Sequence, residues 1–236
     1  MTAINKRIVL DAVNHHFAIK QQHITLFDNL SLTINSAKSH AIVGPSGAGK
    51  SSLLLILAGL EAPKSGSVSF YDQDVAQSIN QLKKQSGFIF QQFQLLPELD
   101  AISNIALPLK LNGDKQAMIK ARDWLEQVGL GGRADHKPNE LSGGEQQRVA
   151  IARAFVANPG FVFADEPTGN LDEKTAEQVT DLMFECSRIN HTGLVVVTHN
   201  KTLAQRADVC FELRGGRLVR QGDQTAYTAY TSGEGS

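Results

Sequence analysis

The sequence is poor in the residues that build disulfide-based or metal-based domains. It has only two cysteines, Cys186 and Cys210, and neither has a second thiol or a histidine at metal-ligand spacing. We therefore expect buried structural thiols, one in a helix and one in a strand, without a redox or metal role. His15 and His16 are neighbours on an expected strand, where adjacent side chains point to opposite faces, so we do not expect them to share an ion.

An excess of either charge is also missing. Lys and Arg number 23 against 24 for Asp and Glu, and the formal net charge is -1. Without surplus cations to neutralise a phosphate backbone, nucleic acid is not an expected partner.

No hydrophobic run is long enough to cross a bilayer. The longest, LLLILAGL at residues 53–60, falls far short of the roughly 20 residues of a spanning helix. The N-terminal segment also lacks the long apolar core of a secretory signal. The chain itself is expected to be soluble and cytosolic.

What is present is an alternation of strand-like and helix-like segments in a 236-residue chain. Residues 7–13 and 24–34 are apolar and β-branched, as is typical of a small antiparallel layer. Between residues 100 and 129 the apolar residues follow helical spacing. Further along, helices separate apolar strands, which implies right-handed crossovers and a largely parallel buried sheet. The expected elements are strands at 40–43, 161–164 and 194–197, helices at 53–60, 145–157, 173–189 and 201–207, and a closing hairpin at 209–213 and 217–221.

The clearest motif is GPSGAGKSS at residues 44–52, between a short apolar strand and a helix. Small residues let successive backbone amides point at phosphate oxygens, and the following helix offers its positive dipole end. Lys50 can reach the β and γ phosphates, and the Ser51 hydroxyl can ligate Mg²⁺. The expected nucleotide-binding residues are Gly44, Pro45, Ser46, Gly47, Ala48, Gly49, Lys50, Ser51 and Ser52.

A second motif is FVFADE at residues 161–166, an apolar strand that ends in two carboxylates. The carboxyl edge of a parallel sheet is its usual ligand-binding edge. There Asp165 can hold Mg²⁺, and Glu166 can accept a proton from the water that attacks the γ-phosphate. The alternative is a solvated strand end with no catalytic role.

A third motif is LSGGEQQ at residues 141–147, in which Ser142, Gly143 and Gly144 precede a helix expected to begin near Glu145. A glycine-lined helix start can bind an anion. Taken alone, Ser142 can equally be an ordinary helix N-cap.

These motifs, together with Gln91 after GFIF, GNLD at 169–172 and His199 after LVVVT, occur in the order seen in ABC ATPases. The chain resembles that family over nearly its whole length. The resemblance implies a P-loop NTPase fold of the α/β class, in which a largely parallel sheet is flanked by helices and joined by an N-terminal antiparallel β layer and a helical subdomain. It also implies a single ABC ATPase domain over 1–236, with a catalytic lobe at about 1–91 and 159–222, a helical lobe at about 92–158 and a polar tail at 223–236.

The resemblance also implies roles for residues that match the family's motifs. Two copies of the chain are expected to enclose two MgATP molecules, with Ser142, Gly143, Gly144 and Glu145 of each copy against the nucleotide of the other. Glu166, His199 and Gln91 are expected to be catalytic, and Ser51, Gln91 and Asp165 to contact the metal. Asp172 is expected to join the two sites across the dimer, and Phe17 to stack on adenine, with an ordinary core aromatic as its alternative.

A narrower resemblance concerns the kind of transporter. QQFQLLPELDAISNIALPL at 91–109 and ADEPTGNLD at 164–172 resemble the ATPases of lipoprotein-releasing and macrolide-exporting systems. This implies an integral membrane permease as partner and a position at the cytoplasmic face of the bacterial inner membrane. Phe93, Leu95, Leu96 and Pro97 are expected either to form the floor of a groove for that partner or to cap the core of the helical lobe.

Two other functions are weighed against transport by an exporter. An importer ATPase more often carries SALD where this chain has GNLD. A soluble ABC ATPase acting on DNA or ribosomes generally needs a coiled-coil insertion or two cassettes, and this sequence has neither. The predicted reaction in every case is hydrolysis of ATP to ADP and phosphate.

Overall fold

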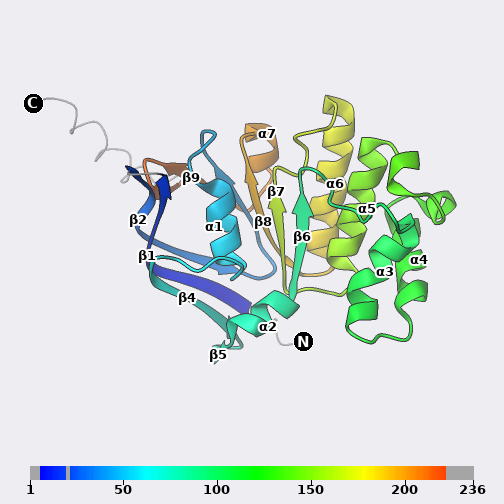
Figure 1. Cartoon of the computed structure of the whole chain (residues 1–236), viewed down its shortest axis with the longest axis horizontal. Helices are drawn as coiled ribbons and strands as arrows, with labels where there is room; N and C mark the ends of the chain where they lie inside the picture. The colour runs from blue at the N-terminus through cyan, green and yellow to red at the C-terminus, as the bar shows by residue number, and fades with distance from the viewer. Residues whose placement is uncertain (1–5, 20–21, 222–236) are drawn as a thin grey trace, which may run out of the picture.

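The computed structural model describes residues 6–19 and 22–221, and the side chains of these residues except for positions 17–24 (Figure 1). The predicted polar tail, residues 223–236, lies outside the described residues. The side chain of Phe17 lies outside them as well.

A four-stranded antiparallel sheet forms one layer of the molecule. β1 (Lys6–Ile19) pairs with β2 (Gln22–Asn35) on one side and with β4 (Ser65–Asp72) on the other, and β5 (Val75–Gln77) follows β4 at the edge. The predicted N-terminal antiparallel layer is therefore confirmed, and both of its predicted strands are longer than expected. β4 and β5 were not predicted, although Val68 and Phe70 carry the alternation of a half-buried strand, and Phe70 is fully buried.

The second sheet has six strands in the order β10-β9-β3-β8-β7-β6. All neighbouring pairs are parallel except β9 with β10, which form the predicted hairpin. The strands are β3 (Ser39–Val43), β6 (Ser86–Phe90), β7 (Phe161–Asp165), β8 (Gly193–Thr198), β9 (Val209–Arg214) and β10 (Arg217–Arg220).

The parallel sheet is buried on both faces, as its apolar strands predict. Phe161 and Phe163 of β7 pack into a core with α1 and the antiparallel sheet. Val162 and Ala164, which alternate with them, pack into a second core with the helices on the other face. α1 therefore lies between the two sheets, while α5 and α6 cover the opposite face of the parallel sheet and α3 and α4 lie beyond them (Figure 1).

The helices match the predicted ones closely, but several of their ends differ. α5 begins at Gly143 and not near Glu145, because Ser142 is its N-cap. α1 ends at Leu57 and not at residue 60, because the chain turns at Gly59 with φ 70°. α7 ends at Ala204, three residues before its predicted end. The helices are α1 (Lys50–Leu57), α2 (Ile79–Lys84), α3 (Ala101–Leu111), α4 (Ala117–Gln127), α5 (Gly143–Phe155), α6 (Glu173–Ile189) and α7 (Lys201–Ala204).

The thiols and the two adjacent histidines occupy ordinary structural positions. Cys186 is buried in α6, and burial raises the pKa of its thiol to about 11. Cys210 in β9 is only half-buried, so the prediction of two buried thiols is right for Cys186 alone. His15 is buried, and its Nε2 lies 2.9 Å from Oε1 of Glu61, whereas His16 is partly exposed.

Among the described residues, no helix combines the length and the apolar character needed to span a membrane.

Candidate nucleotide-binding and catalytic site

Four neighbouring parallel strands bring most of the predicted site residues to one edge of the sheet. Gly44, His199, Glu166 and Gln91 follow the carboxyl ends of β3, β8, β7 and β6, which are adjacent in that order. Parallel strands present their carboxyl ends at the same edge, where ligands of open α/β sheets bind. Residues more than 150 positions apart in the chain are thereby placed beside one another.

The turn between β3 and α1 has the form of a phosphate-binding loop. Gly47 and Gly49 have φ angles of 78° and 93°, in the left-handed region that favours glycine. A Cβ on Gly44 would lie 2.5 Å from the carbonyl oxygen of Leu213, so the strand end also requires glycine. Gly49 is the N-cap of α1 and supplies no side-chain bond, which leaves the first amides of the helix without a side-chain cap. Such amides are available to phosphate oxygens.

Lys50 places a cation inside this turn. Only 9% of the residue is exposed, and its Nζ donates to the carbonyl oxygens of Gly44 (3.0 Å) and Pro45 (3.2 Å). The same Nζ lies 3.9 Å from Oε1 of Glu166. The ammonium group therefore lies between the turn and the acidic end of β7.

Glu166 is held in a fixed orientation by the end of β8. Its backbone has φ 44°, a left-handed conformation that is uncommon for a non-glycine residue. Its Oε2 accepts hydrogen bonds from the Thr198 hydroxyl (2.9 Å) and the His199 amide (3.3 Å), and its Oε1 lies 3.0 Å from His199 Nδ1. The structure thus brings Lys50, Glu166 and His199 into one cluster.

Asp165 and Ser51 offer two oxygen ligands side by side. Burial raises the pKa of Asp165, and the negative charge of Glu166 raises it further, while a hydrogen bond from the Ser51 side chain and the Lys50 charge act in the opposite direction. A carboxylate that is buried beside a second carboxylate is stabilised by a cation. A hydroxyl and a carboxylate are also the hard oxygen donors that Mg²⁺ prefers, so this pair fits the ion.

Gln91 lies at the same sheet edge but is bonded elsewhere. Its Nε2 donates to Oδ1 of Asn170 (3.1 Å), and Asn170 Nδ2 donates back to the Gln91 carbonyl (3.0 Å). No hydrogen bond joins Gln91 to Ser51 or Asp165 in the part of the chain that the structure describes. Of the three expected metal ligands, two are adjacent and the third is held against the β7–α6 loop.

The start of α5 is closed by a reciprocal cap between two of its own residues. Ser142 Oγ accepts from the Glu145 amide (3.3 Å), and Glu145 Oε2 accepts from the Ser142 amide (2.8 Å), which is a capping box. These bonds to Ser142, and further contacts with Arg133, lower the pKa of Glu145. Among the described residues, no hydrogen bond or ion pair connects Ser142–Glu145 with the phosphate-binding turn. A single copy of the chain therefore keeps the two anion-binding turns separate.

Asp172 caps α6. Its Oδ1 accepts from the Thr175 amide (3.0 Å), and hydrogen bonds from the side chain and the amide of Thr175 lower the pKa of this exposed carboxyl group. The prediction that this helix begins at Glu173 is confirmed.

Three polar residues that the sequence analysis did not select support the loops around the site. Gln147 is fully buried and donates to the carbonyl of Pro167 (2.6 Å), next to Glu166. Asn104 is fully buried and bonds the backbone of Leu96, at both its amide and its carbonyl. Arg153 bonds the loop after β6. Each is a polar residue within an apolar helical stretch, and that pattern was the available signal.

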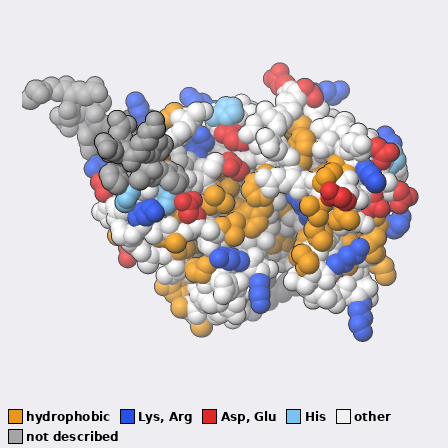
Figure 2. Space-filling view, viewed as in Figure 1, with side chains coloured by type: hydrophobic (Ala, Val, Ile, Leu, Met, Phe, Trp, Pro, Cys, Tyr) orange, Lys and Arg blue, Asp and Glu red, His pale blue; other side chains and the backbone are white. Residues whose placement is uncertain are grey.

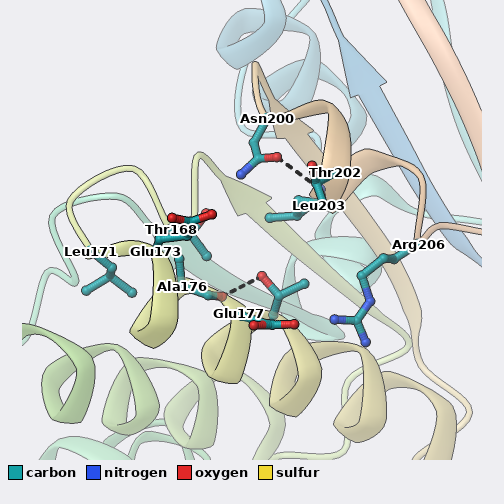
Figure 3. Close-up of a pocket in the computed structure, with 10 residues that line it drawn as sticks. Thr168, Leu171, Glu173, Ala176, Glu177, Asn200, Thr202, Leu203 and Arg206 are labelled. Carbon is teal, nitrogen blue, oxygen red and sulfur yellow. Dashed lines mark hydrogen bonds between the residues drawn. The ribbon is translucent and has the colours of Figure 1, made fainter.

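Two hollows of about 490 Å³ each lie on either side of the residues that follow β8. One contains Gly44, Pro45 and His199, together with Lys201 and Glu212. The other lies between α6 and α7, where Thr168 and Asn200 face the Glu173–Glu177 turn of α6 (Figure 3). In this second hollow Asn200 Oδ1 accepts from the Leu203 amide (3.1 Å) and thereby begins α7.

Comparisons with known proteins find similar sequences and similar folds. The model of the ABC transporter family matches residues 27–169. The chain is 46% identical over 215 residues to the lipoprotein-releasing system ATP-binding protein LolD of Xanthomonas oryzae pv. oryzae, covering 88% of each chain. It is 44% identical to the uncharacterized ABC transporter ATP-binding protein YbbA of Escherichia coli, covering 85% of this chain and 91% of YbbA.

A solved structure shares the fold over almost its entire length. It is the dimeric ATP-binding cassette MJ0796 in a post-hydrolysis state, bound to ADP and Pi, with a TM-score of 0.78 and 34% identity, covering 90% of this chain and 97% of that chain. The similarity therefore includes both sheets and the helices around them.

Proposed function

Since the chain belongs to the ABC transporter family and is an ATP-hydrolysing subunit of it, we propose that two copies close around two MgATP molecules and thereby drive a conformational change in a membrane partner. The observation that carries the proposal is the gathering of Lys50, Glu166 and His199 at the carboxyl edge of four parallel strands. A similar cassette is dimeric and binds the products of hydrolysis.

Each nucleotide site is proposed to be completed by the second copy. Ser142 is exposed, and among the residues that the structure describes no hydrogen bond or ion pair joins its glycine-lined turn to the phosphate-binding turn of the same chain. Ser142, Gly143, Gly144 and Glu145 are therefore proposed to face the nucleotide of the partner copy. Asp172, at the exposed start of α6, is proposed to lie between the two sites.

In the proposed reaction the chain positions the phosphates and the attacking water. Lys50 donates to the β and γ phosphates, since its ammonium is already directed into the turn. Glu166 accepts the proton of the water, and His199 holds the carboxylate and the γ-phosphate in line. Mg²⁺ held by Ser51 and Asp165, with Gln91 completing the set, would neutralise charge on the phosphate oxygens.

The membrane partner is proposed to dock on the loop after β6 and the neighbouring helices. Leu95 packs against the helical core, whereas Leu96 is 42% exposed and Pro97 is exposed, so the segment both caps the core and presents an apolar surface. On this side of the molecule hydrophobic side chains lie among acidic and basic ones (Figure 2). α3, α4 and the loop before them are at the opposite end from the antiparallel sheet, which supports a helical lobe at about 92–158 (Figure 1).

We further propose that the system is an exporter of the lipoprotein-releasing or macrolide-efflux type, at the cytoplasmic face of the inner membrane. The support is the 46% identity to a protein named as the ATP-binding component of a lipoprotein-releasing system. A permease with few spans and a large extracytoplasmic domain is the expected partner.

Co-purification from detergent-solubilised membranes tests this proposal. The wild-type chain should retain a permease of that type, and the complex should hydrolyse MgATP. Leu96→Asp should lose the permease, because a charge on the docking surface is costly to desolvate. Ile189→Asp should retain it, since Ile189 is 60% exposed at the far end of α6. Recovery of ribosomes, DNA or a permease with many spans and no extracytoplasmic domain would contradict the proposal.

A further inference from the structure

The loop after β6 contains two consecutive residues in an unfavourable backbone conformation. Phe93 and Gln94 have φ angles of 58° and 48°. The Phe93 amide bonds the Phe90 carbonyl (3.1 Å) and the Gln94 amide bonds the Gln92 carbonyl (2.5 Å), so the chain reverses within residues 90–94. A left-handed conformation is unfavourable for a non-glycine residue and persists only where surrounding contacts maintain it.

The contact that maintains this turn comes from α5. Arg153 donates from Nη1 to the carbonyl of Gln94 (2.7 Å) and from Nη2 to the carbonyl of Phe93 (2.9 Å). The two carbonyls of the strained residues are thus bound by one rigid planar group. Burial lowers the pKa of this guanidinium, and within the described residues it forms no ion pair with a carboxylate. Partial burial of a guanidinium without a carboxylate partner costs desolvation free energy that an apolar side chain at this position would not cost. Its geometry therefore points to a positioning role.

The same turn is held from a second side. Gln91 makes two hydrogen bonds with Asn170, and a Cβ on Gly169 would lie 2.8 Å from Gln91 Nε2, so the side chain packs closely on the β7–α6 loop. The Phe93 ring lies 3.6 Å from where a Cβ on Gly143 would be, at the start of α5. The turn therefore lies between the loop that follows Glu166 and the helix that begins at Gly143.

We propose that Arg153 is a positioning residue for ATP hydrolysis: it holds the 91–94 turn so that Gln91 keeps its place at the carboxyl edge of the sheet. Because Arg153 and Ser142–Glu145 belong to one helix or its cap, a displacement of α5 moves both together. An anion that binds at the start of α5 and displaces this helix then changes the position of Gln91 through the Arg153 hydrogen bonds. This inference rests on the role proposed above for Gln91.

Arg153→Lys tests the proposal, since a lysine keeps the charge but cannot bond both carbonyls in the same plane. We expect kcat for ATP to fall between about ten- and a hundredfold, as for a displaced catalytic group. The KM for ATP should stay within about twofold, because the phosphate-binding turn is untouched, and the Mg²⁺ concentration for half-maximal turnover should rise. Without nucleotide, hydrogen exchange of the 91–96 amides should be faster than in the wild type.

Arg148→Lys is the matched control on the same helix. Arg148 donates to the Val128 carbonyl (3.2 Å) and to Gln178 (3.1 Å), and within the described part of the chain it forms no hydrogen bond with the 91–94 turn. Its substitution should change neither kcat, nor the Mg²⁺ dependence, nor exchange at residues 91–96. Equal behaviour of Arg153→Lys and Arg148→Lys would overturn the proposal.

Two further variants separate positioning from a general loss of structure. The first adds Gln94→Asn to Arg153→Lys. Because asparagine adopts the left-handed region more readily than glutamine, the double variant should recover part of the kcat that Arg153→Lys loses. In a Gln91→Ala background, Arg153→Lys should cause little additional loss of kcat. If the losses of kcat in Arg153→Lys and Gln91→Ala were fully additive, Arg153 would not act through Gln91. Failure of the proposed function gives a different result, because Glu166→Gln would then leave ATP turnover unchanged.

Discussion

Two glycine-rich turns begin helices in this molecule, and they satisfy the first amides of those helices in different ways. The turn before α1 ends at Gly49, which provides no side-chain cap, and it encloses the Lys50 ammonium. The turn before α5 is closed by the Ser142–Glu145 capping box, with Arg133 Nε 3.0 Å from Glu145 Oε1 on its outer side. The first amides of α1 have no side-chain cap, whereas at the start of α5 the Glu145 amide already bonds Ser142.

The difference separates two ways of binding an anion. The first turn offers amides, a helix dipole and a buried cation, so a single chain can bind phosphates there. At the second turn a carboxylate of the chain itself, Glu145, already occupies the helix N-terminus. An incoming phosphate must share the turn with this carboxylate or displace it, which fits a contact made only when a second copy closes over the site.

The largest expected effect concerns the two carboxylates associated with these turns. Glu166→Gln should retain ATP binding but lower turnover by about 10²- to 10⁴-fold, because an amide cannot accept the proton of the attacking water. Glu145→Gln should lower turnover by less than about tenfold, since an amide oxygen still accepts from the Ser142 amide. Steady-state phosphate release measures both. Near-normal turnover in Glu166→Gln would refute its catalytic role. Equal losses of turnover in Glu166→Gln and Glu145→Gln would show that the two carboxylates do not differ in role.

The next prediction concerns the strand that leads into the first turn. Burial is the main reason that the pKa of His40 on β3 falls to about 4, partly opposed by Asp208. Because the unfolded chain binds the proton more tightly, this group favours folding above about pH 6.5, and the contribution is lost as pH falls from about 6.5 to 4. The loss is about 3 kcal/mol.

Chemical denaturation at a series of pH values checks this prediction. Replacing the buried ring in His40→Phe should remove that part of the pH dependence, whereas His191→Asn, at an exposed position, should retain it. If the wild type and His40→Phe lost stability in parallel between pH 6.5 and 4, the buried histidine would not be responsible.

The cations of the two turns should differ in their effect on ATP affinity. Lys50→Ala should weaken ATP binding by about 1.5–3 kcal/mol, because the phosphates lose their nearest cation. Arg133→Ala should leave the affinity of an isolated copy unchanged, since Arg133 pairs with Glu145 at the other turn. Titration with a fluorescent ATP analogue gives both values. Unchanged affinity in Lys50→Ala would show that the first turn does not depend on its cation.

The smallest effect should separate the serines of the two turns. Ser142→Ala should destabilise the fold by about 1 kcal/mol through loss of the N-cap. Ser46→Ala should change stability by less than about 0.5 kcal/mol, as Ser46 is exposed and caps no helix. Thermal unfolding without nucleotide compares the two variants. If Ser46→Ala were as destabilising as Ser142→Ala, the first turn would have an internal cap after all.

The fold was predictable wherever its signal is local. The antiparallel N-terminal layer and the helices over 100–129 follow from apolar, β-branched composition and helical spacing, and the structure bears them out, as it does the predicted start of α6 at Glu173. The start of α5 was placed two residues late, because glycines at 143 and 144 suggested a loop while Ser142 is in fact the cap. β4, β5 and α2 were not predicted, because β4 is held by pairing with β1, β5 by pairing with β4, and α2 buries a single residue, Leu82.

The site residues likewise fall into those that a local motif indicates and those whose partners are distant in the chain. Residues within one motif, such as Gly44–Ser51 or Asp165–Glu166, could be chosen from sequence because neighbours in the chain share one turn. For Arg153 and Gln147 the sequence offers only the signal of a polar residue in an apolar helical stretch. It does not show their partners, which are carbonyls 59, 60 and 20 residues away.

By itself, the sequence determined the α/β alternation, the composition of the phosphate-binding turn and the acids at the end of β7, since each is written in consecutive residues with local physical consequences. Only the tertiary structure decided that Lys50, Glu166 and His199 share one cluster, that Gln91 is bonded to Asn170, and that Arg153 holds the turn between them. The reason is the strand order β3-β8-β7-β6, which brings chain segments together through backbone pairing in the buried sheet and not through any nearby residue.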